Sequence, residues 1–317
     1  MRLIMVGTGP FGVPTFRGLF ETNHTVVALV TAPIRRRRGK PMSPVSSIRD
    51  VAHEHGVPIL DPEDVNTSDS QLNLCEYKAD LSIVCDYGQI LSADVLAATR
   101  WGGVNLHGSL LPKYRGAAPI NWAIYHGDLE TGVTVIHMTP QVDAGPCIAQ
   151  ANIEIDPDET AVELENRLSE MGAWLMRRAI DSIQEGRLEA LPQDASAACN
   201  ARRLKKSDGV IDWSRSAVAI KNQVRAFEPW PKTFTYWHRP PGRPVRLILG
   251  PIAVVDSLDA DVTPGAVVRC DGGKLVVATG RQAVRIESVQ PAGKRMLSAE
   301  EFLRGYHVQP GERFGPE

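Results

Sequence analysis

The sequence contains few cysteines and no long apolar run. Its five cysteines are odd in number, scattered, and free of any Cys-x-x-Cys pair: Cys75, Cys85, Cys147, Cys199 and Cys270. This pattern argues against a disulfide framework and a zinc site, and it predicts a reduced, cytoplasmic protein. No apolar segment is long enough to span a bilayer, and the apolar start at Met1–Val6 ends too soon at Gly7 for a signal peptide.

Charge is nearly balanced in total but unevenly distributed. The 317 residues carry 35 Lys and Arg against 37 Asp and Glu, a net charge of −2. Residues 201–317 hold 19 basic and 12 acidic residues, which leaves 16 and 25 for residues 1–200, so the two parts carry +7 and −9. This asymmetry predicts that a polyanion contacts the second part, and the chain length favours two domains.

Three polar residues that can act on a carbonyl group are expected to meet at one sheet edge. Asn105 and His107 are two residues apart at the carboxyl end of a short predicted strand, so their side chains share one face. Open α/β sheets place their chemistry at that end. Asp143 follows a second strand-like run, 132–137, and a turn that can return it to His107. We therefore predict an amide, an imidazole and a carboxylate in one cleft.

This trio suits direct transfer of a small acyl group to an amine. The Asn105 amide and the His107 imidazole can stabilise an oxyanion, while the carboxylate of Asp143 favours the charged imidazole and can accept a proton, directly or through water. Ser109 is the nearby nucleophile, but it leads into an apolar Leu-Leu-Pro turn instead of a Gly-x-Ser-x-Gly elbow. A covalent acyl-enzyme is therefore disfavoured.

These residues resemble the formyltransferases that use 10-formyltetrahydrofolate. The resemblance rests on Asn105-x-His107-x-Ser109-Leu110-Leu111-Pro112, on Arg115-Gly116 and on Asp143-x-Gly145. It implies that 10-formyltetrahydrofolate is the formyl donor, and that Asn105, His107 and Asp143 are the catalytic residues. The folate contacts that it implies are Ser109, Leu110, Leu111 and Pro112 in the turn, and Gly88, Gln89, Ile90 and Leu91 after the predicted strand at 81–85.

Other stretches are similar to the tRNA-directed branch of this family. Residues 224–231 and 290–296 resemble its second-domain signatures, and the basic segment at 35–40 resembles its tRNA-engaging loop. The resemblance implies transfer to the free amino group of methionyl initiator tRNA, for translation initiation, with no metal and no protein partner. Arginines and lysines suit phosphate oxygens, and the implied tRNA contacts are Arg35, Arg36, Arg37, Arg38, Lys40, Arg202, Arg203, Lys205 and Lys206.

Periodicity and breaks divide the chain into two kinds of structure. A buried strand at 2–6, a helix at 12–21 and a long helix after the capping box Thr160–Glu163 predict an α/β domain. Short strands separated by breaks at 240–242, 264–265 and 271–273 predict a small β-barrel. The fold that we predict is α/β: a Rossmann-like formyltransferase domain (1–190), a basic linker (191–206) and a C-terminal OB-like tRNA-binding domain (207–317).

Two other enzymes remain as alternatives. Gly7-x-Gly9-x-x-Gly12 reproduces the dinucleotide fingerprint, and the arginines at 35–38 could hold the 2′-phosphate of NADP, which predicts a reductase. No acidic residue ends the second predicted strand, 25–31, as an NAD site requires. The pairs Lys113-Tyr114 and Asn121-Trp122 somewhat resemble residues of the formyltransferases that act on amino-sugar nucleotides, which are the second alternative.

Three further interpretations involve no transfer chemistry. A barrel with a basic patch could form an RNA-binding module, although this leaves the complete set of Asn105, His107 and Asp143 unexplained. Asn105 and His107 could instead merely cap strand ends. His126 and His137 with His107 suggest a metal centre, but their spacing matches no metal-ligand motif.

Overall fold

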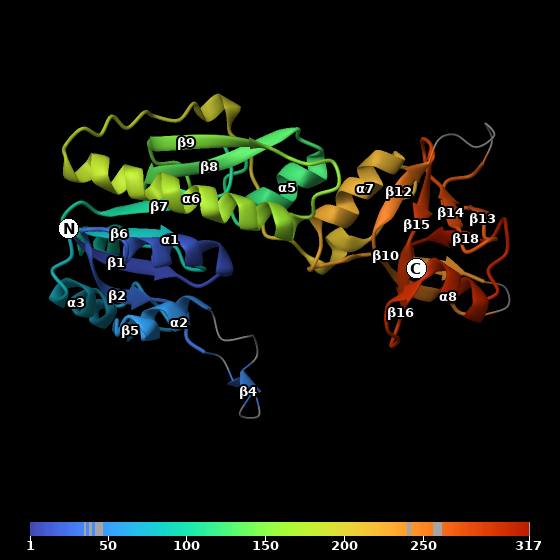
Figure 1. Cartoon of the computed structure of the whole chain (residues 1–317), viewed down its shortest axis with the longest axis horizontal. Helices are drawn as coiled ribbons and strands as arrows, with labels where there is room; N and C mark the ends of the chain where they lie inside the picture. The colour runs from blue at the N-terminus through green and yellow to red at the C-terminus, as the bar shows by residue number, and fades with distance from the viewer. Residues whose placement is uncertain (35, 38–39, 42–46, 240–241, 256–261, 317) are drawn as a thin grey trace. The chain divides into compact units, whose positions relative to one another are not determined.

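The computed structural model describes residues 1–34, 36–37, 40–41, 47–239, 242–255 and 262–316, which form two compact units (Figure 1). The first unit comprises Met1–Pro119, Glu130–Glu154 and Glu163–Arg202. The second comprises Ile120–Leu129, Ile155–Val162 and Arg203–Glu317. No helix in the described part of the chain is both long and apolar enough to cross a membrane.

The first unit is built on a seven-stranded sheet whose order reverses in the manner of a doubly wound fold. The strands run β5 (Ile59–Leu60), β2 (Thr25–Val30), β1 (Arg2–Gly7), β6 (Leu81–Cys85), β7 (Gly103–His107), β8 (Glu130–His137) and β9 (Cys147–Glu154). The strands from β5 to β7 pair in parallel, whereas β8 and β9 are antiparallel. The predicted Rossmann-like α/β domain is confirmed.

Helices cover both faces of this sheet. On one face, Leu74 of α3 (Ser68–Glu76) and Val95 of α4 (Ala93–Ala97) pack against Ile4 of β1 and Val84 of β6. The other face carries α1 (Val13–Leu19), which follows the short 3-10 helix Pro10–Gly12, together with α2 (Ser47–Glu54) and the long α6 (Ala161–Gln184), as Figure 1 shows. Apolar residues at helical spacing therefore bury each helix against the sheet.

Close packing of α6 fixes the strand that carries the candidate site. Leu106 of β7 points towards α6 and is 2% exposed. A Cβ added to Gly172 of α6 would lie 2.5 Å from Cδ2 of Leu106. The absence of a side chain at Gly172 thus lets the helix approach β7, while alternation directs Asn105 and His107 to the opposite face.

The second unit is an antiparallel β structure, as predicted for the OB-like domain. One sheet has the order β17 (Leu297–Ser298), β16 (Ser288–Pro291), β11 (Val245–Leu249), β10 (Thr233–His238) and β18 (Arg313–Gly315). The other has the order β12 (Ile252–Val255), β15 (Ala283–Ile286), β14 (Leu275–Ala278) and β13 (Val267–Arg269). Their shared core includes Trp213, Trp237, Leu247, Leu275, Val284 and Phe314, with Phe302 of α8 (Ala299–Gly305).

Two segments that precede Glu163 in the chain belong to this second unit. Arg225 of α7 (Ala217–Ala226) is 8% exposed, and its Nη1 donates to the carbonyl oxygens of Asp156 and Glu159 at 3.1 and 3.0 Å. Asn121 of α5 (Pro119–His126) donates through Nδ2 to the carbonyl oxygen of Ala226 at 2.7 Å. These bonds to main-chain carbonyls attach residues 120–129 and 155–162 to α7.

We expect replacement of Gly172 by Ala to lower the melting temperature. The new methyl group gains helix propensity but must displace the buried Leu106, and overpacking typically costs about 1–3 kcal/mol. Gly18→Ala in α1 is the matched control, because its Cβ would meet nothing closer than 3.7 Å. Calorimetry should therefore show a lower melting temperature for Gly172→Ala and an unchanged or higher one for Gly18→Ala.

The addition of Leu106→Val to the Gly172→Ala variant should restore part of the loss by shortening the clashing side chain. Equal melting temperatures for the two single glycine variants would contradict this account of the α6 contact.

Candidate functional site

The three predicted catalytic residues converge on one carboxylate. Asn105 Nδ2 lies 3.4 Å from Asp143 Oδ1, and His107 Nδ1 lies 3.6 Å from Asp143 Oδ2. The same Oδ2 accepts a hydrogen bond from the backbone amide of Gly116 at 2.8 Å. On its other side, His107 Nε2 is 2.9 Å from the carbonyl oxygen of Tyr114. An amide, an imidazole and a carboxylate therefore lie together at the carboxyl end of β7.

The two contacts of His107 define its orientation. The residue is 6% exposed. Because a carbonyl oxygen can only accept a hydrogen bond, Nε2 must carry the hydrogen that it shares with Tyr114. Nδ1 then faces the carboxylate of Asp143 at 3.6 Å. The ring therefore lies between the Tyr114 carbonyl, to which it is hydrogen-bonded, and the more distant carboxylate of Asp143.

Unusual backbone conformations hold this arrangement. Asp143 has a φ of 49° and Tyr114 a φ of 61°, values in the left-handed region that non-glycine residues rarely adopt. Gly116 has a φ of 118°, and a Cβ there would lie 2.7 Å from the carbonyl oxygen of Ala201. A Cβ at Gly145 would overlap the carbonyl oxygen of His137. The two glycines of the motifs are thus required by close approach of the backbone.

Internal hydrogen bonds fix the turn at 109–112. Ser109 is fully buried, and its Oγ donates to the carbonyl oxygen of Lys113 at 2.6 Å. Thr134 Oγ1 donates to the Ser109 carbonyl at 2.7 Å and accepts from the Leu111 amide at 3.1 Å. Gln150 Nε2 donates to the Leu111 carbonyl at 2.7 Å. The hydroxyl of Ser109 therefore shapes the turn from inside.

The candidate folate-binding residues differ in their exposure. Leu110 and Pro112 are partly exposed, whereas Leu111 is 4% exposed. In the second segment Gly88 is exposed and Ile90 is 64% exposed, whereas Leu91 is 3% exposed. Because β6 and β7 are parallel neighbours in the sheet, both segments follow the carboxyl ends of these strands, on the same side of the sheet.

Gln89 belongs to the same candidate set, but its side chain is engaged within the fold. Its Oε1 accepts a hydrogen bond from the Val65 amide at 3.0 Å. A ligand at this edge would therefore meet the main chain of this segment more readily than the Gln89 amide.

The glycines of the dinucleotide-like pattern have a packing role. A Cβ at Gly7 would lie 2.5 Å from the carbonyl oxygen of Cys85, and one at Gly9 would overlap the Asp86 carboxylate. A Cβ at Gly12 would lie 3.3 Å from Cβ of Cys85. These glycines let the loop after β1 lie against the end of β6, so the pattern is explained without a dinucleotide.

The candidate tRNA-binding residues fall in two places. Arg202, Arg203, Lys205 and Lys206 are exposed on either side of Leu204, which is 7% exposed. Arg36–Arg37 (β3) and Lys40–Pro41 (β4) pair as antiparallel strands. Arg35 and Arg38 lie outside the described residues.

Sequence reasoning missed Gln193, which contacts two of the motif segments. Its Nε2 donates to the carbonyl oxygens of Asp143 and Gly145 at 2.8 and 2.7 Å. Its Oε1 accepts from Nε and Nη2 of Arg115 at 3.1 and 2.7 Å. Gln193 lies in the predicted linker and in no periodic pattern, so no signal in the sequence identifies it. Thr134 and Gln150, which support the turn, were also missed, although both lie in strands.

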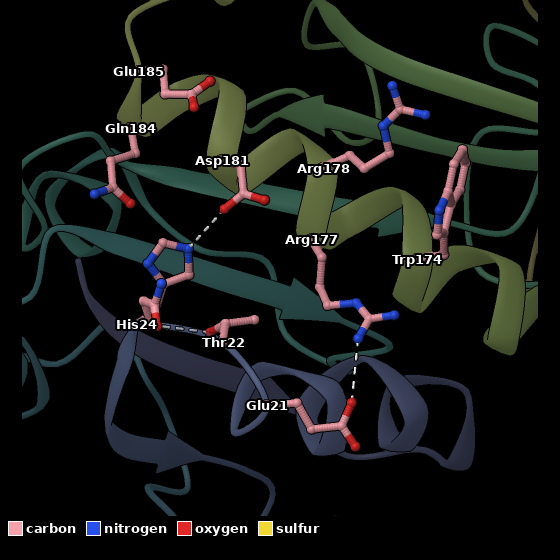
Figure 2. A pocket seen from close by; sticks show the side chains of 10 residues that line it. Glu21, Thr22, His24, Trp174, Arg177, Arg178, Asp181, Gln184 and Glu185 are labelled. Carbon is pink, nitrogen blue, oxygen red and sulfur yellow. Dashed lines mark hydrogen bonds and ion pairs between the residues drawn. The ribbon is translucent and has the colours of Figure 1, made fainter.

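A separate pocket of about 540 Å³ lies in the first unit between the end of α1 and the second half of α6 (Figure 2). Its charged side chains face one another: His24 Nε2 lies 3.3 Å from Asp181 Oδ1, and Arg177 donates to Glu21 at 3.4 Å. None of the described candidate residues lines it. The pocket is therefore distinct from the candidate site.

Comparison with known proteins identifies the two units. Residues 1–180 match the family model described as formyl transferase, and residues 203–307 match the model of the formyl transferase C-terminal domain. A methionyl-tRNA formyltransferase of Geobacter sulfurreducens is 38% identical over 316 residues, which cover 99% of this chain and 97% of that protein. A methionyl-tRNA formyltransferase of Rhodopirellula baltica is 40% identical, with 99% and 96% of the chains covered.

Solved structures share the fold at low sequence identity. An N-formyltransferase of Helicobacter canadensis, in complex with folinic acid and dTDP-3-aminofucose, aligns with a TM-score of 0.67 at 16% identity and covers 91% of this chain and 98% of that one. HypX of Aquifex aeolicus in complex with tetrahydrofolic acid aligns with a TM-score of 0.60 at 16% identity, covering 96% of this chain and 47% of that one.

Proposed function

Because the chain belongs to the formyl transferase family, we propose that it transfers a formyl group from 10-formyltetrahydrofolate to the free amino group of methionyl initiator tRNA, for translation initiation. The family predicted from the sequence is confirmed by relatives that match along nearly the whole chain. The convergence of Asn105 and His107 on Asp143 carries the proposal, because it provides the chemistry of amide formation. We assign the protein to the cytoplasm, where initiator tRNA is used.

In the proposed reaction, the amine nitrogen attacks the formyl carbon and a tetrahedral oxyanion forms. The Asn105 Nδ2 hydrogens and the positive charge of the His107 ring stabilise this oxyanion. When the tetrahedral species collapses, the carbonyl reforms and the bond from the formyl carbon to the donor nitrogen breaks. Asp143 accepts the amine proton, directly or through water, and returns this proton to the folate nitrogen as that nitrogen leaves.

The lengths of the contacts suit these roles. The supporting hydrogen bonds, from Gly116 to Asp143 and from His107 to Tyr114, are 2.8 and 2.9 Å long. The contacts among the three reacting side chains are 3.4 and 3.6 Å long. Catalytic contacts are often long in ligand-free proteins and shorten around the substrate. The backbone bonds therefore orient the side chains of His107 and Asp143 firmly. The longer contacts among the three side chains can be replaced by contacts to the substrate.

The charge distribution supports a nucleic acid as the acceptor. Lys205 and Lys206 are exposed, and so are Arg202 and Arg203 beside them. Basic side chains here and in the segment 35–40 are each suited to contact phosphate groups. The compact diphosphate of a nucleotide sugar offers too few charges to use both stretches.

An amino-sugar nucleotide is the alternative acceptor, but the residues that suggest it have other roles here. Tyr114 is 8% exposed, and its carbonyl oxygen bonds His107. The Asn121 amide bonds the carbonyl oxygen of Ala226 within the second unit. The likeness to the Helicobacter canadensis enzyme, at 16% identity, shows the fold alone.

An acceptor assay tests the proposed function. With 10-formyltetrahydrofolate as donor, the protein should formylate charged initiator tRNA and leave a dTDP-linked amino sugar unchanged.

Calorimetry should detect binding of a reduced folate and none of NADPH, since Gly7, Gly9 and Gly12 are occupied by packing contacts. Formylation of the sugar alone would favour the alternative acceptor, and NADPH binding without folate binding would restore the reductase as an interpretation.

The variants Asn105→Ala, His107→Ala and Asp143→Ala should each remain folded. Each loses a contact to the transition state, so kcat for tRNA formylation should fall by about two orders of magnitude or more. Circular dichroism and steady-state kinetics check both statements. Near-normal turnover of His107→Ala would remove the residue from the mechanism.

Replacement of Arg36, Arg37 and Arg38 together by Ala should raise KM for the tRNA and weaken its salt dependence. Each neutralised phosphate contributes about −0.9 to the slope of log K against log salt for B-DNA, and duplex RNA should behave comparably, so loss of three contacts flattens the slope by up to about 2.7. The affinity for reduced folate is the internal control and should be unchanged. If KM and the salt slope are unaltered, the basic segment 35–40 does not contact the tRNA and is only a run of solvated charges.

A further inference from the structure

The loop that carries Asp143 is held by a side chain from outside the loop. Asp143 has a φ of 49°, so its conformation needs support from its surroundings. Gln193 Nε2 donates to the carbonyl oxygens of both Asp143 and Gly145, at 2.8 and 2.7 Å. The two hydrogens of one amide group therefore hold the two ends of the strained turn.

The other end of the Gln193 amide reaches the loop after β7. Its Oε1 accepts two hydrogen bonds from the guanidinium of Arg115, at 3.1 and 2.7 Å. Arg115 lies between Tyr114 and Gly116 in the chain. The Tyr114 carbonyl oxygen accepts a hydrogen bond from His107, and the Gly116 amide donates one to Asp143. One amide thus joins the loop that supports His107 to the loop that carries the carboxylate.

The segment that carries Gln193 is itself anchored on both sides. Leu191 and Cys147 exchange two backbone hydrogen bonds of 2.8 Å each. The backbone of Arg115 donates to Cys199 at 2.9 Å and accepts from Ala201 at 2.7 Å. Gln193 is therefore a fixed support and not a side chain on a free linker, and it can transmit a defined geometry.

We propose that Gln193 is a positioning residue for formyl transfer, which sets the Asp143 carboxylate against His107 through the carbonyl groups of the Asp143 loop. This inference rests on the proposed function. Gln193 supplies no group to the substrate, because all four of its described bonds go to the protein. Its effect on the reaction should therefore pass through Asp143.

Gln193→Met retains similar volume but removes both the donors and the acceptor. We expect kcat to fall by about 10- to 100-fold, since small displacements of a catalytic group are costly. KM for folate and for tRNA should stay within about twofold, because neither binding surface is altered. Gln193→Glu keeps the acceptor for Arg115 but lacks the two donors, so it should lose turnover to at least the same extent.

Gln184→Met in α6 is the matched control. This glutamine lines the pocket that is distinct from the candidate site. The same replacement there should leave kcat and both KM values unchanged. Melting temperatures of all variants separate a loss of folding from a loss of positioning, and Gln193→Glu provides the measurement if Gln193→Met does not fold.

A double-mutant cycle with Asp143→Ala gives the decisive result. If Gln193 acts through the carboxylate, Gln193→Met should lower kcat by less than about twofold once Asp143 has been replaced. An equal fold-loss in both backgrounds would overturn the inference while the formyl transfer itself stands. A wild-type protein that transfers no formyl group to tRNA would overturn the proposed function, and this inference with it.

Discussion

The hydrogen bond from the Gly116 amide to the carboxylate of Asp143 is the contact on which the candidate site depends. It joins loops that are 27 residues apart and places a negative charge beside His107. The contact requires a left-handed conformation at Asp143 and a glycine at 116, since a Cβ there would meet Ala201. Such conformations persist only when the surroundings determine them, and this explains why hydrogen bonds to the main chain surround the site.

The proximity of the candidate catalytic groups could be predicted from the sequence because they follow simple rules. A period of two along β7 placed Asn105 and His107 on one face, and parallel strands direct chemistry to their carboxyl ends. Asp143 was joined to them by the strand-like run 132–137 and the turn that follows it, and the family motif supported this. Gln193 could not be predicted, because its partners lie 48 to 78 residues away and a single polar residue in a coil has no periodicity.

The division into units shows a second limit of sequence reasoning. The order of α/β and β patterns predicted two kinds of domain, but residues 120–129 and 155–162 pack with the second unit. Burial lowers the pKa of Arg225, yet its guanidinium still donates to two carbonyl oxygens of the 155–162 segment. Buried arginines that bond the main chain leave no sequence pattern, because the carbonyl partner is present at every residue.

Rigid and yielding contacts together suit the proposed direct transfer without a covalent intermediate. Ser109 is fully buried with its hydroxyl bonded to Lys113, so the residue that could act as a nucleophile serves the turn instead. The remaining groups can stabilise charge and move a proton, but they form no bond to the formyl carbon. For such a site the rate depends on how well donors are aligned before the reaction, since preorganised dipoles cost no reorganisation in the transition state. In the proposed reaction, the dense hydrogen bonding around Asp143 would therefore contribute to the rate by alignment of the catalytic groups, since no nucleophile of the protein takes part.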